Sequence, residues 1–91
     1  MPRVPSPAAV HIGGRIRGAR ESSTMTQDDL ASRSGIDSSN IRAYESGRAM
    51  PSIHTLLRIA VAMRTPIDYF LTDLTLEMFP ANASDGRRRT A

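Results

Sequence analysis

The amino-acid sequence predicts an all-α fold of five short helices in one small domain, and three observations support this. The chain has 91 residues and no cysteine, so its limited core must be packed without disulfides. Apolar residues recur at spacings of three and four over most of the chain, as in amphipathic helices. Good capping residues and glycines divide the chain at short intervals, which predicts short helices with short connections.

The first helix is expected at residues 10–22, where Ile12, Ile16 and Ala19 recur at helical spacing. Glycines at positions 13, 14 and 18 weaken it, since each costs about 1 kcal/mol relative to alanine, so tertiary packing must hold this helix. Residues 1–9 contain three prolines and little apolar periodicity, and we expect them to form a flexible arm.

The next two helices are bounded by caps and glycines. Thr26 is a good N-cap for a second helix that ends at Gly35, a residue that tolerates a left-handed backbone. Asp37 is expected to cap a third helix that ends before Gly47. Small Ala31 suits a close crossing of the two helices. The apolar residues that would join them in the core are Leu30, Ile36, Ile41 and Tyr44. This arrangement predicts a helix-turn-helix.

Two further helices complete the predicted domain, which spans residues 10–73. Ser52 is expected to cap the fourth, and Thr65 the fifth, with Pro66 at the first position of the fifth. The buried face of the fifth helix is expected to be Ile67, Phe70 and Leu71.

After the fifth helix, the pattern is ambiguous. Residues 74–80 form an apolar extension whose alternation fits a strand, although Leu71, Leu74 and Met78 also share one helical face. Residues 81–91, with Arg87 to Arg89, are expected to be a disordered basic tail.

Composition limits the class of protein. No stretch approaches the roughly 18 apolar residues of a membrane span, and no signal segment opens the chain, so we expect a soluble, cytoplasmic protein without a membrane partner. The net charge is +3, which alone is weak evidence for a nucleic-acid partner because several arginines lie in the two tails.

The sequence contains no recognisable catalytic, cofactor or metal site. His11 and His54 lie far apart, and no serine has the setting of a nucleophile elbow. Asp28 and Asp29 are adjacent, so on a helix they diverge by about 100° and do not form a facing acid pair. We therefore expect no enzymatic activity, no cofactor and no metal.

The stretch TQDDLASRSGIDSSNIRAYESGRAMPSIHTLLRIA, residues 26–60, resembles the five-helix DNA-binding domain of lambda-repressor, Cro and Xre type regulators. The resemblance extends over roughly residues 11–71. It implies a lambda-repressor-like fold with a helix-turn-helix at the second and third helices. The implied partner is double-stranded DNA, which the third helix would read in the major groove.

The resemblance also implies residue roles. Gln27 would touch a phosphate and brace the start of the third helix, while Arg20 and Glu45 match a partly buried structural ion pair. The residues implied to face base edges are Ser38, Ser39, Asn40, Arg42 and Ala43, and those beside the DNA backbone are Ser46 and Arg48. Asparagine pairs well with adenine and arginine with guanine, and Arg42 is the only long cation on the expected reading face.

From these expectations we predict that the protein is a sequence-specific transcriptional regulator. It is expected to act as a dimeric repressor that binds an inverted repeat in the major groove. The expected dimer residues are Ile67, Phe70, Leu74, Leu76, Met78 and Phe79, because an exposed apolar segment is unusual on a monomer. The alternative that residues 74–79 fold onto their own domain remains open. Two other functions also remain open: an antitoxin that holds a toxin and controls its own operon, and a protein-interaction module without DNA contact.

Overall fold

A computed structural model of the protein describes residues 6–79; the predicted tail and the first part of the predicted arm lie outside the described residues. Within this range the fold is entirely helical, which confirms the predicted fold class. The helices are α1 (Pro7–Ser22), α2 (Gln27–Ser34), α3 (Ser38–Glu45), α4 (Ile53–Ala62), α5 (Ile67–Leu71) and a short 3-10 helix, η1 (Leu76–Met78). None of the helices in residues 6–79 has the length and apolar content of a membrane span.

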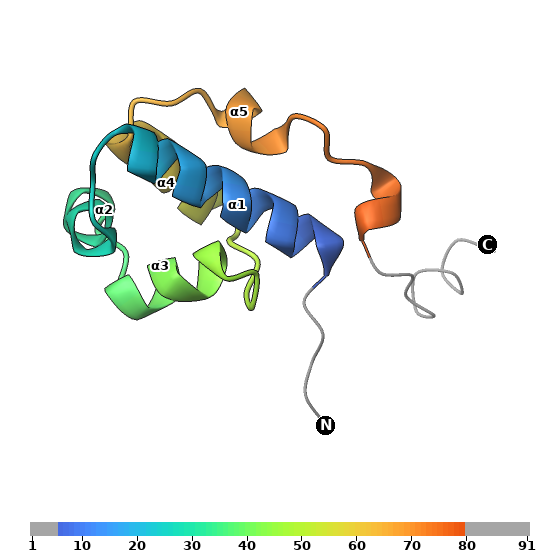
Figure 1. Ribbon diagram of the computed structural model, residues 1–91, viewed down its shortest axis with the longest axis horizontal. Helices are drawn as coiled ribbons and strands as arrows, with labels where there is room; N and C mark the ends of the chain where they lie inside the picture. The colour runs from blue at the N-terminus through green and yellow to red at the C-terminus, as the bar shows by residue number, and fades with distance from the viewer. Residues whose placement is uncertain (1–5, 80–91) are drawn as a thin grey trace.

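Helix α1 lies in the middle of the domain, with α3 on one side of it and α5 on the other (Figure 1). Helices α2 and α3 pack against each other, and α4 packs against α2 and α5. The interior is built from large side chains contributed by all five helices: Ile12, Ile16, Leu30, Ile41, Leu56, Ile59 and Phe70. The fold thus holds α3 at one side of the molecule, against α1 and α2.

Helix α1 begins three residues earlier than the sequence predicts. Ser6 is its N-cap and accepts a hydrogen bond from the backbone N–H of Ala9 at 3.1 Å. Pro7 occupies the first helical position, where its missing N–H has no cost. Ala8 and Ala9 are buried. The predicted arm is therefore wrong for residues 7–9, because this proline starts a helix.

The fifth helix is shorter than expected and differs in its cap. It contains five residues, Pro66 precedes it, and it has no side-chain cap. Thr65 instead donates to the Met63 carbonyl. Phe70 has no exposed surface and Ile67 packs against the core. The expectation that Phe70 takes part in a dimer is wrong, because its side chain is already used inside its own domain.

The segment after α5 forms neither of the regular structures that the sequence left open. Leu74 packs against the core, whereas Leu76 is 84% exposed in the single 3-10 turn of η1. The side chain of Phe79 is also exposed. One end of this segment therefore belongs to the domain, and the other presents apolar surface.

Candidate nucleic-acid interface

The outer face of α3 is exposed, as the helix-turn-helix prediction requires. Ser39, Asn40 and Arg42 are exposed, whereas Ile41 between them is fully buried and anchors the helix in the core. Ser38 and Ala43 are half-buried. Asp37 stands at the N-cap position without a side-chain cap bond; the Ser39 hydroxyl donates to its carboxylate. The inner face of α3 therefore fixes the helix and leaves its polar face open to a partner.

Helix α2 begins with a reciprocal capping box. The Thr26 hydroxyl accepts from the backbone N–H of Asp29 at 2.9 Å, and the Asp29 carboxylate accepts from the backbone N–H of Thr26 at 2.9 Å. The backbone N–H and the hydroxyl of Thr26 both lower the pKa of Asp29 below its ordinary value. This box fixes the position of Gln27, the first residue of α2.

The turn between α2 and α3 uses the predicted left-handed glycine. Gly35 has φ of 75°, a conformation that disfavours residues with a Cβ. Arg58 of α4 donates from Nε to the Ser34 carbonyl at 3.1 Å and from a terminal nitrogen to the Gly35 carbonyl at 3.4 Å. A guanidinium beside the end of a helix also suits the helix dipole. The turn is thus stabilised by the left-handed backbone of Gly35 and by the hydrogen bonds from Arg58 of α4.

The predicted ion pair ties α3 to α1. Arg20 donates from Nε to Glu45 Oε2 at 2.6 Å and from a terminal nitrogen to Oε1 at 3.0 Å, and a third bond reaches the Met25 carbonyl at 2.8 Å. The hydrogen bonds that Arg20 donates to the Glu45 carboxylate raise the pKa of Arg20 above its ordinary value. Gln27 also donates to Glu45 Oε1, at 3.0 Å. In the structure Gln27 thus braces the end of α3 and not its start.

The crossing of α1 and α3 depends on a glycine whose role the sequence did not reveal. An added Cβ at Gly13 would lie 2.1 Å from the carbonyl oxygen of Tyr44 and 3.0 Å from that of Glu45. From the sequence alone, Gly13 predicts only a weaker α1. The contact joins residues that are distant in sequence, so neither helical periodicity nor the local sequence could have indicated it.

Four of the predicted DNA-contact residues lie around one surface hollow. Gln27, Arg42, Ser46 and Arg48 line a hollow of about 300 Å³ together with Glu45 and with Arg17 of α1. Ser38, Ser39, Asn40 and Ala43 are not part of it. Arg17 was missing from the sequence prediction because only the packing of α1 against α3 places it there. Its position in an arginine-rich helix was the only available signal.

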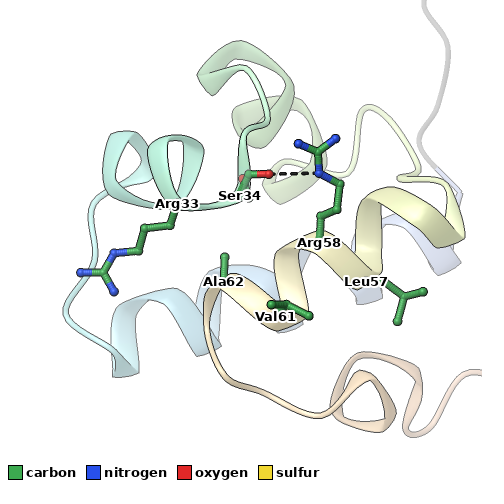
Figure 2. A pocket seen from close by; sticks show the side chains of 6 residues that line it. All are labelled: Arg33, Ser34, Leu57, Arg58, Val61 and Ala62. Carbon is green, nitrogen blue, oxygen red and sulfur yellow. Dashed lines mark hydrogen bonds between the residues drawn. The ribbon is translucent and has the colours of Figure 1, made fainter.

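A second hollow, of about 270 Å³, lies between α2 and α4 (Figure 2) and is lined by Arg33, Ser34, Leu57, Arg58, Val61 and Ala62. Figure 2 shows the guanidinium groups of Arg33 and Arg58 pointing apart. None of the predicted DNA-contact residues lines this hollow. Nowhere in residues 6–79 do three histidine, aspartate or glutamate side chains gather as metal ligands would.

The fold and the exposed face of α3 define a helix-turn-helix domain. The helix-turn-helix family model HTH_3 matches residues 16–70. A transcriptional regulator from the ATPase CF(0) region of Rhodospirillum rubrum is 42% identical over 64 residues, which are 70% of this chain and 59% of that protein. The transcriptional repressor of the cryptic phage CTXphi, from Vibrio cholerae, is 33% identical over 57 residues, which are 63% of this chain and 51% of that protein.

The solved structures agree with this match. The crystal structure of the restriction-modification controller protein C.AhdI from Aeromonas hydrophila has a TM-score of 0.67 and 29% identity, over 68% of this chain and 94% of that one. The chain therefore belongs to the helix-turn-helix family of lambda-repressor and Xre type regulators. It spans 59% and 51% of the length of the two curated relatives described above.

Proposed function

We propose that this protein is a sequence-specific regulator of transcription that binds double-stranded DNA with α3 in the major groove. The observation that carries the proposal is the division of α3 into two faces. Ile41 is fully buried, while Asn40 and Arg42 beside it are exposed. A helix that is anchored in this way can enter the major groove of DNA, where its polar side chains can form hydrogen bonds with the edges of the bases. Its place of action would be the cytoplasm, with the chromosome.

We further propose that the protein acts as a homodimeric repressor on an inverted repeat. A single domain of this size covers limited DNA surface, whereas two domains would place their α3 helices in successive major grooves about 34 Å apart. The apolar side chains of Leu76 and Phe79 are exposed and available to a second copy. The relative from phage CTXphi is a transcriptional repressor, which supports the direction of regulation.

Selection of bound sites from a pool of random duplexes tests the function directly. The expected result is one enriched motif with twofold symmetry and half-sites about one helical turn apart. Failure of the full chain to enrich or bind any duplex at low salt would overturn the proposal. An enriched motif without twofold symmetry would overturn the dimeric arrangement alone.

Base readout by Arg42 is a second expectation of the same proposal. Arg42→Ala should weaken binding to the selected site by about 1–3 kcal/mol and relax the preference for one base pair. Arg33→Ala is the matched control, because Arg33 is also an exposed arginine but lines the other hollow. An equal loss on selected and random duplexes would show that Arg42 contacts only the backbone.

A further inference from the structure

Arg17 lies on the face of α1 that packs against the end of α3. Positions 13, 17 and 20 are four and three residues apart and share one side of a helix. Gly13 contacts the backbone of Tyr44 and Glu45, and Arg20 binds the Glu45 carboxylate. Arg17 lies between these two contact points and lines the same hollow as Gln27 and Arg48. The crossing of α1 and α3 therefore carries Arg17 to the predicted DNA face.

The charges around this hollow favour an anion. Arg17, Arg42 and Arg48 line it, and its single carboxylate, Glu45, is already paired with Arg20. Arg17 donates from Nε to Glu21 at 3.1 Å, and Arg48 donates from Nε to the Ser46 hydroxyl at 3.2 Å. Within residues 6–79 the terminal guanidinium nitrogens of Arg17 and Arg48 make no hydrogen bond. These nitrogens form the fork that suits the oxygens of a phosphate group.

We propose that Arg17 contacts a phosphodiester of the DNA backbone, which it holds together with Gln27 and Arg48 while Arg42 reaches the bases. This inference rests on the proposed function and adds to it a DNA contact from α1, outside the helix-turn-helix. Glu21 accepts a hydrogen bond from Nε of Arg17 and so leaves the terminal nitrogens of Arg17 available to a phosphate. Its negative charge at the same time opposes the approach of the phosphate.

The test compares Arg17→Ala with Arg33→Ala in the full chain, by titrating selected and random duplexes at several salt concentrations. Both variants remove one exposed arginine and the same net charge, and only Arg17 lines the hollow. Arg17→Ala should weaken binding about tenfold on both duplexes. It should also make the slope of log affinity against log salt shallower by about 0.9. Arg33→Ala should change neither quantity.

Two further variants separate charge from shape. Arg17→Lys should keep the salt slope of the wild type, because the charge remains. Glu21→Gln keeps an oxygen that can accept from Arg17 but removes the opposing charge, so affinity should rise about twofold to fivefold. Equal affinity and salt slope in Arg17→Ala and Arg33→Ala would overturn the inference, whatever the other variants do.

The source of the phosphate is tested by replacing chloride with inorganic phosphate at constant ionic strength. If a DNA phosphodiester occupies the hollow, inorganic phosphate should weaken duplex binding by the wild-type chain more than by Arg17→Ala. Phosphate that binds the wild-type chain through Arg17 but leaves its duplex affinity unchanged would assign the hollow to a free anion and overturn the inference. Absence of duplex binding by the wild-type chain would overturn the proposed function as well, so the two failures are distinguishable.

Discussion

At the scale of single residues, Gly13 and Gly14 are neighbours in α1 with opposite surroundings. A Cβ at Gly13 would lie 2.1 Å from a backbone oxygen of α3, whereas a Cβ at Gly14 would meet nothing within 4 Å. Gly13→Ala should therefore lower the free energy of unfolding by about 1–3 kcal/mol, since the backbone of α3 must shift. Gly14→Ala should raise it by about 0.5–1 kcal/mol, because alanine favours the helix.

Chemical denaturation of the two variants checks this prediction, with Gly14→Ala as the matched control for Gly13→Ala. The same change in stability for both, of either sign, would contradict the close crossing of α1 and α3.

The residue roles that are predictable from the sequence come from the family resemblance and from local turn chemistry. The resemblance implies the ion pair of Arg20 with Glu45, the turn predicts the left-handed Gly35, and the structure has both. The functions of Gly13 and Arg17 depend on which part of α3 passes α1. No local pattern encodes that contact, so neither function is readable from the sequence alone.

At the scale of elements, one carboxylate connects three helices. Glu45 accepts from Arg20 of α1 and from Gln27 of α2, and its side chain is only 4% exposed. Glu45→Gln should lower the free energy of unfolding by about 3 kcal/mol, because the Arg20 guanidinium, which is largely removed from solvent, loses its counter-charge. The double variant Arg20→Met with Glu45→Met should be more stable than Glu45→Gln, because it leaves no unpaired charge.

Equilibrium unfolding of wild type, Arg20→Met, Glu45→Met and the double variant, analysed as a mutant cycle, separates the interaction of the pair from the packing of its aliphatic parts. A double variant at least as unstable as Glu45→Gln would show that the charge itself contributes little.

The capping box of α2 predicts a dependence of stability on pH. Hydrogen bonds from Thr26 lower the pKa of Asp29 below its ordinary value of 3.8. The ionised Asp29 carboxylate therefore contributes its full stabilisation of the folded protein above about pH 3.8. This contribution is lost as the pH falls through the lower pKa that Asp29 has in the folded state. Asp29→Asn lacks the charge, so its stability deficit should be constant near neutral pH and shrink in acid.

Thermal melting of wild type and Asp29→Asn between pH 7 and pH 2 measures this difference, within the range where both unfold reversibly. A deficit that grows in acid would assign the opposite direction to the pKa shift.

Element boundaries were predictable where a capping residue and a glycine enclose a helix. Thr26 with Gly35 and Ser52 at the start of α4 are in their predicted places. The start of α1 was misplaced because Pro7 fits either an arm or a first helical position. The end of the chain was ambiguous because Leu74 faces the core and Leu76 faces solvent within one short segment.

At the scale of the whole molecule, the predicted dimer depends on where apolar surface is exposed. Leu76 is 84% exposed and Val61 of α4 is 76% exposed, so glutamate at either position leaves the core intact. If residues 74–79 form the dimer interface, Leu76→Glu should raise the dissociation constant of the dimer more than about tenfold. Val61→Glu should leave it unchanged.

Sedimentation or light scattering over a concentration series measures both variants. Dissociation caused by Val61→Glu and not by Leu76→Glu would assign the dimer interface to α4, where Ile53 and Leu57 are also exposed.

The separation of the two faces of α3 has a consequence for how such a protein changes over time. The buried side of α3 is constrained by its neighbours on α1 and α2. Position 13 of α1, where α3 crosses, has no room for a side chain. By contrast, Ser39, Asn40 and Arg42 are exposed, so other side chains at these positions do not clash with the rest of the domain. Under the proposed function, a few substitutions at these exposed positions change the preferred DNA site while the buried scaffold stays the same.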